Sequence, residues 1–231
     1  DIEIDAPVAN NGTGFVPNFV PLALWMGVVM TAFVFHLRHL PAAARGFSPV
    51  AQLVGKMAVP NAIVVAQALL VAAMLAFALD IRVAHWPGVV LSMVLASLTF
   101  MLIILAFTRA FGDTGKALAL ILLIVQLSSA GGILPIELTG SFFQSLSPWM
   151  PFTWVVRSLR ASLFGAYDSA WVSAWLVVLA TALVALVFAS FLIGLGGQIV
   201  DNMQMIEPVP QVDQFIDPAQ GGQVKARLDQ A

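Results

Sequence analysis

Five long apolar stretches occupy most of this chain, and each is close to the roughly 20 residues that a helix needs to cross a hydrocarbon layer. They run over about 19–35, 57–79, 89–107, 117–134 and 171–195. Because 60% of the residues are hydrophobic and only 10% are charged, the chain has too little polar surface for a fold surrounded by water. The sequence therefore predicts an all-α fold: a polytopic membrane helical bundle with five transmembrane helices.

Charge and cysteine content exclude several classes of function. A net charge of −2 gives no basic footprint of the kind that nucleic-acid binders show, so we expect no nucleic-acid partner. The chain has no cysteine, which removes disulfides, thiolate metal sites and cysteine nucleophiles together. The partner that the composition does imply is the lipid bilayer.

Catalytic and metal-binding patterns are incomplete. His36 and His39 could share one helix face, but no carboxylate or thiol ligand lies beside them. Ser128 and Ser129 lie near a helix end within a predicted span, yet no histidine falls in a span where it could activate them as a general base. We therefore expect no enzyme, no cofactor and no metal.

The fourth apolar stretch ends in a helix break. Gly131, Gly132 and Pro135 should stop the helix near the outer surface, because proline cannot continue the hydrogen-bond ladder and glycine weakens it. Beyond the break, aromatic residues alternate with serine, glutamine and proline, which suits a membrane interface. Residues 135–166 are therefore expected to form a re-entrant or outer-surface helical hairpin that packs on the bundle.

Two amides lie inside predicted spans. Gln67 and Gln126 each need a hydrogen-bond partner in hydrocarbon, so they indicate either a bond between helices or a transport pathway. Small residues also recur at four-residue spacing on the second and fifth stretches, and such faces let helix backbones approach closely. That spacing is compatible with a homodimer seam, but it also arises by chance in an alanine-rich chain.

Lysine and arginine near the helix ends predict the orientation. One side carries Arg38, Arg45, Lys56, Arg109 and Lys116, and the positive-inside rule makes that side the cytoplasm. The opposite side carries Arg82, Arg157 and Arg160. The N-terminus would then be external and the C-terminus cytoplasmic. We expect residues 1–18 to end an extracellular region of a longer protein, 19–196 to be the membrane domain, and the acidic, proline-containing 197–231 to be a disordered cytoplasmic tail.

Several separated motifs resemble one family in order and spacing. They are Gly112-Asp113-x-Gly115, Gln126-Leu127-x-Ser129-x-Gly131-Gly132-x-x-Pro135, Ser147-Pro148-x-x-Pro151 and Arg157-x-x-Arg160, together with the entry Asn11-Gly12-Thr13-Gly14-Phe15-x-Pro17-x-Phe19 and Leu24-Trp25-x-Gly27. This set resembles the C-terminal membrane domain of the YhgE/Pip (phage infection protein) family, which belongs with the ABC type-2 permeases. The resemblance covers nearly all of the chain except the tail.

The resemblance implies a function and a cytoplasmic contact. ABC type-2 permeases dock on a separate ATPase through a loop between two spans, and by position that loop is 41–56 here, with Arg45, Val50, Leu53 and Lys56 as its residues. Its prolines and glycine favour two short pieces, with 50–54 as the apolar docking side. The implied function is a permease subunit of an exporter for an amphipathic substrate in the bacterial plasma membrane. The alternative is a membrane-anchored surface receptor or secretion-system component whose bundle is a scaffold.

Two arginines follow the aromatic hairpin. Arg157 and Arg160 are three residues apart, so on a helix they share a face near the outer boundary. They either extend to lipid phosphates as interfacial anchors or border the outer exit of a transport path and meet an anionic group.

Overall fold

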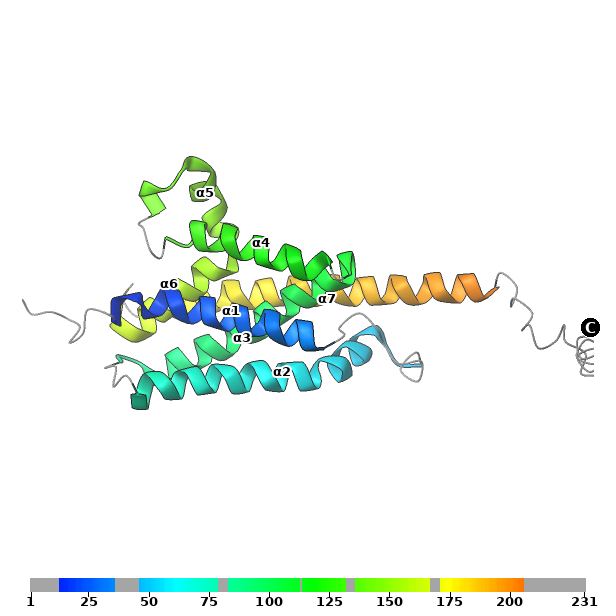
Figure 1. Cartoon of the computed structure of the whole chain (residues 1–231), viewed down its shortest axis with the longest axis horizontal. Helices are drawn as coiled ribbons and strands as arrows, with labels where there is room; N and C mark the ends of the chain where they lie inside the picture. Colours follow the sequence, from blue (N-terminus) through cyan, green and yellow to red (C-terminus); the bar gives the residue numbers. More distant parts are fainter. Residues whose placement is uncertain are drawn as a thin grey trace, which may run out of the picture. The chain divides into compact units, whose positions relative to one another are not determined.

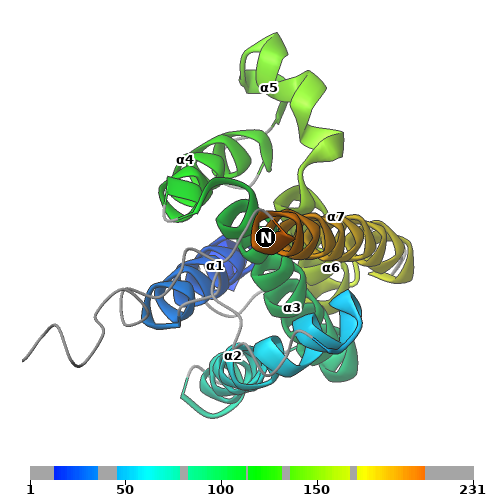
Figure 2. The same ribbon diagram turned by 90° about the vertical axis from the view of Figure 1, so that its right-hand side faces the viewer.

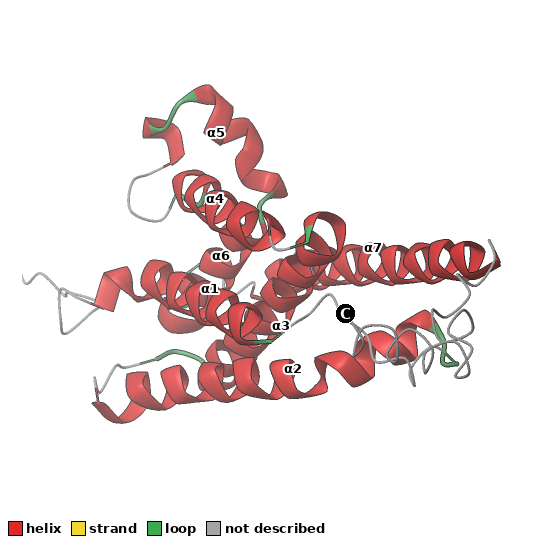
Figure 3. Cartoon of the chain, turned by 45° about the vertical axis from the view of Figure 1, so that its right-hand side comes forward, coloured by secondary structure: helices red, strands yellow, loops and turns green. Residues whose placement is uncertain are grey.

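The computed structural model describes residues 13–35, 46–78, 83–112, 114–131, 136–166 and 171–205, with side chains up to residue 192. Every regular element in these ranges is a helix (Figure 3). The chain divides into two units, 1–193 and 194–231, and the bundle described below belongs to the first. Arg45, Gly132, Pro135, residues 1–12 and most of the predicted tail lie outside the described residues.

The helices follow one another along the chain with short connections (Figure 1). In order they are η1 (Thr13–Phe15), α1 (Val16–Val34), α2 (Pro49–Ala73), its π-helical extension η3 (Met74–Ala78), α3 (Trp86–Phe111), α4 (Thr114–Ser129), η4 (Ile136–Leu138), α5 (Ser141–Leu146), η5 (Ser147–Trp149), α6 (Pro151–Phe164) and α7 (Trp171–Met205).

Proline and glycine mark the helix ends. Each of α1, α2, α3 and α6 has a proline in its first two positions, where the missing N–H would have no intrahelical acceptor. Gly112 ends α3 with φ 65° and Gly165 ends α6 with φ 67°, a region that glycine enters without steric cost. These residues fix where the apolar stretches become separate helices.

Four described helices are long and apolar enough to cross a membrane: Thr13–Val34, Val50–Ala78, Trp86–Phe111 and Trp171–Leu192. The fourth predicted stretch, 117–134, differs from the others, because its helix α4 begins earlier, at Thr114, and ends at Ser129. Its 16 residues extend about 24 Å, less than the ~30 Å hydrocarbon layer. The helix stops short because Gly131 takes φ 60° just beyond it.

The second predicted span also has different bounds. α2 starts at Pro49 and continues without a break through the apolar stretch, so residues 50–56 are its first turns rather than a separate short helix. Proline was expected to interrupt this region, but Pro49 occupies the first helical turn, and the Ser48 hydroxyl accepts a hydrogen bond from the Ala51 N–H at 3.3 Å.

The core of the bundle is organised around α3. This helix packs against α1, α2, α4 and α6, as the view in Figure 2 shows. Trp25 of α1 meets Phe100 of α3 edge to face at 4.8 Å between ring centroids, and Phe100 stacks on Phe152 of α6 at 6.3 Å. All three rings are fully buried, and the Trp25 indole N–H donates to the Ala119 carbonyl of α4 at 3.2 Å. One aromatic cluster thus joins four helices.

A glycine contact joins α1 to α2. The Gln67 amide lies against Gly27 and its Nε2 donates to the Ala23 carbonyl at 3.0 Å. A Cβ on Gly27 would stand 2.0 Å from Gln67 Nε2, so only glycine leaves room for this amide.

We predict that Gly27→Ala lowers the unfolding free energy by about 1 kcal/mol, because Gln67 must move and lose its bond to Ala23. The double variant Gly27→Ala/Gln67→Ala should recover most of the melting temperature, measured by thermal shift in detergent. Gly55→Ala is the matched control, because nothing lies within 4 Å of a Cβ there. A double variant no more stable than Gly27→Ala would show that the contact with Gln67 is not the cause.

Candidate functional site

The end of α4 and the start of α6 form a hydrogen-bonded joint, defined by Gln126, Ser129 and Gly131 on one side and Phe152, Thr153 and Arg160 on the other. Gln126 Oε1 accepts from the Phe152 N–H at 3.3 Å. The Thr153 hydroxyl donates to the Ser129 carbonyl at 3.5 Å, and Arg160 Nη2 donates to the Gly131 carbonyl at 3.1 Å. The joint therefore holds α6 against the point where α4 stops.

Gln126 acts as a cap supplied from a different helix. The Phe152 N–H is in the first turn of α6 and has no intrahelical acceptor, and Met150 at the N-cap position offers no side-chain hydrogen bond. Gln126 is fully buried and fills that role through Oε1. Its Nε2 has no hydrogen-bond partner among the residues that the structure describes, so only the oxygen of this buried amide is satisfied there.

The two arginines differ in their surroundings. Arg160 is half-buried and reaches back to the carbonyl of Gly131. Arg157 is exposed, with its guanidinium 5.5 Å from the centre of the Trp154 ring. The Trp154 indole N–H donates to the Pro148 carbonyl at 2.8 Å, so the ring under Arg157 is held by the η5 turn. Arg160 thus contributes to the joint, whereas Arg157 presents its charge outward.

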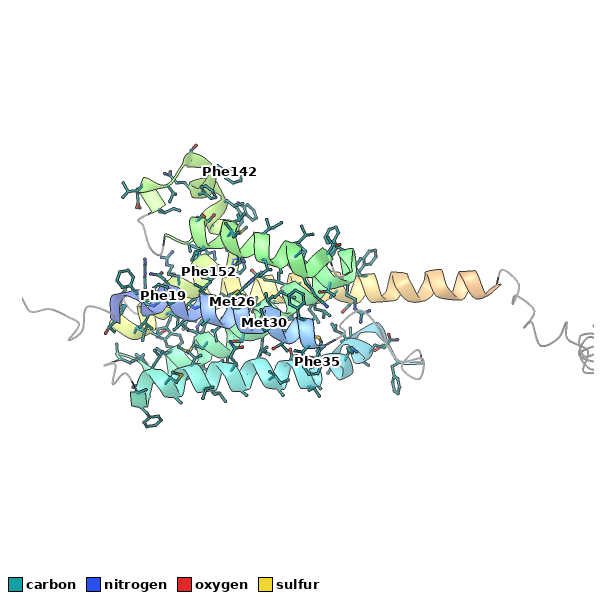
Figure 4. All side chains as sticks on the ribbon, in the orientation of Figure 1. Phe19, Met26, Met30, Phe35, Phe142 and Phe152 are labelled. Carbon is teal, nitrogen blue, oxygen red and sulfur yellow. The ribbon has the colours of Figure 1, made fainter. Side chains whose placement is uncertain are left out.

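The segment before α6 carries exposed apolar side chains. α5 and η5 extend beyond α4 (Figure 1), and Phe142 points away from the bundle while Phe152 lies within it (Figure 4). Leu138 and Phe142 are largely exposed, and Trp149 is 79% exposed. No charged residue occurs between Leu138 and Val156. An uncharged segment with exposed aromatic rings is suited to the membrane–water interface.

The residues predicted to contact an ATPase differ in exposure at the start of α2. Val50 and Val54 are exposed, Lys56 is half-buried, and Leu53 is fully buried in the core together with Met57. Leu53 therefore belongs to the packing of the bundle, and the exposed apolar side chains of this turn are Val50 and Val54.

The structure also shows hydrogen bonds between α3, α6 and α7 that the sequence did not predict. Ser92 of α3 donates to the Gly88 carbonyl at 2.6 Å, and its oxygen accepts from the Ser158 hydroxyl of α6 at 2.5 Å and from the Trp175 indole N–H of α7 at 2.7 Å. One donated and two accepted bonds use the whole capacity of a hydroxyl. We call these three residues, Ser92, Ser158 and Trp175, the serine cluster.

Backbone contacts support the same region. The His85 N–H donates to the Ser162 carbonyl at 2.9 Å and the Ala84 N–H to the Leu163 carbonyl at 3.0 Å, so the start of α3 is tied to the end of α6. A Cβ on Gly88 would lie 3.1 Å from Ser162 Cβ, which indicates close approach of α3 and α6. Serine gives a weak sequence signal because its hydroxyl can also bond within its own helix.

No group of three or more histidine, aspartate or glutamate side chains that could hold a metal occurs among the residues that the structure describes. What the described chain offers is a helical membrane bundle with a hydrogen-bonded joint at the end of a short helix. These features define the class as a polytopic helical membrane protein.

Comparison with known proteins agrees with this class. The family described as ABC-2 family transporter protein matches residues 3–191, and the chain belongs to it. The chain is also 29% identical over 188 residues to "Uncharacterized protein YhgE" of Bacillus subtilis (strain 168), an alignment that covers 80% of this chain and 24% of that protein. The chain thus spans about a quarter of the length of that relative. No solved structure matches it.

These findings confirm the resemblance inferred from the motifs. The chain is a YhgE-like ABC-2 permease domain, a multi-pass component of the plasma membrane. Its family is that of a transporter's membrane component rather than of a catalytic enzyme.

We predict that Gln126→Leu destabilises the protein by about 1–3 kcal/mol, because the buried Phe152 N–H loses its acceptor. Hydrogen exchange of the peptide that begins α6 should become faster, and the melting temperature should fall. Ser128→Ala is the control, because its hydroxyl bonds only to the Ile124 carbonyl of its own helix among the described contacts. Unchanged exchange at the start of α6 would contradict the capping role of Gln126.

Proposed function

We propose that this chain is the membrane permease subunit of an exporter that moves an amphipathic substrate and takes its energy from a separate ATPase. The observation that carries the proposal is the joint between α4 and α6. Backbone that leaves helical geometry within a membrane is tolerated where protein covers it or where it lines a cavity. Here the Gly131 carbonyl beyond the short α4 is covered by Arg160, as in a helix broken beside a transport path.

In this proposal the bundle has five spans and a hairpin. α4 crosses most of the bilayer toward the outside, residues 135–166 dip into the outer surface and return, and α7 crosses back to the cytoplasm. The exposed rings of Phe142 and Trp149 support the outer placement, because such rings prefer the interface. The distribution of lysine and arginine supports an external N-terminus and a cytoplasmic end of α3 at Arg109.

The substrate class follows from the surroundings of α6. One side of this helix is buried through Phe152, Val155, Val156 and Leu159, and Arg157 projects from it beside an uncharged, aromatic segment. A molecule with an anionic group and an apolar part would find both a cation and apolar surface there. We therefore place the outer exit at Arg157.

The ATPase contact is placed at the first turn of α2. Val50 and Val54 are exposed apolar side chains close together on one helix face, at the cytoplasmic end in the proposed orientation. A homodimer remains part of the proposal, but not through the four-residue spacing on α2 and α7, because Ala68, Ala72, Ala185 and Ala189 are buried within the bundle of one chain.

We predict that Val50→Glu and Val54→Glu reduce the amount of ATPase that co-purifies with the full-length protein at least several-fold, because a carboxylate would be buried in an apolar contact. Gln52→Glu is the matched control: it adds the same charge on the same turn, about 160° around the helix from both valines. If no ATPase co-purifies with the unmodified protein, the receptor or scaffold function replaces export. If the Val50, Val54 and Gln52 variants behave alike, the docking site lies elsewhere.

We predict different effects for the two arginines. Arg157→Gln should leave the melting temperature unchanged but reduce retention of phosphatidylglycerol relative to phosphatidylcholine, measured by native mass spectrometry. Arg160→Gln should lower stability by about 1 kcal/mol, because the Gly131 carbonyl loses its donor. Equal lipid retention in the unmodified protein and Arg157→Gln would remove Arg157 from the exit.

A further inference from the structure

α7 is attached to the bundle differently from the other long helices. Only 17% of its spanning window is buried, against 61% for α1 and for α3. The spanning window of α2 is also mostly exposed, but α2 buries large side chains such as Leu53 and Met57. Among the side chains of α7 that the structure describes, 171–192, the buried apolar ones are small: Ala174, Val178, Ala185 and Ala189. Small side chains bury little apolar area, so this contact contributes little to holding α7 in place.

The polar and aromatic contacts of α7 gather at its first turns. Trp175 donates to Ser92 at 2.7 Å. Trp171 packs on Trp175 at 4.6 Å and faces His85, at the start of α3, at 6.0 Å between ring centroids. Further along α7, the Thr181 hydroxyl bonds to the Val177 carbonyl of its own helix. The attachment of α7 therefore has defined geometry at one end.

That end is connected to the joint through α6. The Ser92 hydroxyl accepts simultaneously from Trp175 of α7 and Ser158 of α6. Ser158 lies two residues before Arg160, which holds the Gly131 carbonyl at the end of α4. A shift of α6 at the joint would therefore move one of the two donors on Ser92 and disturb the acceptor that Trp175 uses.

We propose that the serine cluster is a latch. When it is closed, Ser92 holds the first turns of α7 against α3 and α6; when it is released, this end of α7 moves away from α6 while the bundle around α3 stays packed. Resting on the proposed function, the gap so formed between α6 and α7 is the lateral exit of the amphipathic substrate into the outer leaflet.

The strength of the contacts suits such a device. A hydrogen bond between membrane helices shifts an equilibrium about three-fold on average, because alternative partners exist in the separated state. One such bond together with small apolar contacts can open and close repeatedly. The aromatic cluster of Trp25, Phe100 and Phe152 is fully buried, so it provides the fixed part against which α7 moves.

The test measures the position of α7 directly. Spin labels at Phe19→Cys on α1 and Leu176→Cys on α7, both exposed positions, report the distance between these helices by pulsed electron spin resonance. The full-length protein is used in lipid nanodiscs, with any cysteine outside this chain replaced, since the chain itself has none. Three variants are compared: Ser92→Ala, Trp175→Phe and Ser97→Ala.

Ser97→Ala is the matched control, because Ser97 is fully buried on the same helix and its hydroxyl has no hydrogen-bond partner. We expect Ser92→Ala and Trp175→Phe to increase the longer-distance population about three-fold or more, and Ser97→Ala to leave it unchanged. Trp175→Phe keeps an aromatic ring beside Trp171 and removes the indole N–H, so it tests the same bond from the α7 side if Ser92→Ala fails to fold.

Distances that are the same in Trp175→Phe and Ser97→Ala would overturn the latch, whatever is found for transport. If α7 moves as expected but no ATPase associates with the protein, the latch is supported and the proposed exporter function fails. The two proposals are thus tested separately.

Discussion

The structure depends on satisfying the backbone polar groups where the short, apolar helix α4 ends against α6. Water normally pairs with the free N–H and C=O groups at helix ends, and hydrocarbon offers no substitute. In this chain two side chains replace it: Gln126 accepts from the first turn of α6, and Arg160 donates to the carbonyl beyond α4. These two bonds, together with the packing of Phe152 on Phe100, place α6 against α4 and α3. A change at either residue acts on helix placement as well as on stability.

Polar and apolar contacts have different tasks in this bundle. The rings of Trp25, Phe100 and Phe152 fill the centre, where shape and buried area decide the packing of α1, α3 and α6. The serine cluster specifies which turns of α3, α6 and α7 meet, because a hydroxyl bonds only at short distance and in few directions. The small residues of α7 permit approach without fixing it. Because the serine cluster sets the position of α7 and its small residues add little apolar contact, α7 has a defined position but is held weakly.

The sequence predicted the elements better than their connections. Apolar length identified the long helices, and the glycine signal identified the end of α4 at Gly131, because both signals act within a few residues. Gln67 and Gln126 could be selected, since an amide in a span requires a partner, but the partners at Ala23 and Phe152 depend on how the helices cross. Pro49 was taken as an interruption although it begins α2, and Leu53 was assigned to a docking surface although it is buried. Ser92 gave no signal, because serine is tolerated in helices and only tertiary packing brings Ser158 and Trp175 to it.

The cap on α6 also sets an order of assembly during synthesis. Gln126 leaves the ribosome before Phe152, which is 26 positions later, and Gly131 before Arg160, which is 29 positions later. At the moment when α4 reaches the insertion machinery, its terminal carbonyl has no arginine and its buried amide has no helix to cap. Until α6 has been made, α4 therefore carries two polar groups without their final partners, each at a cost of about 1–3 kcal/mol. The joint between α4 and α6 can close only after Arg160 has been synthesised.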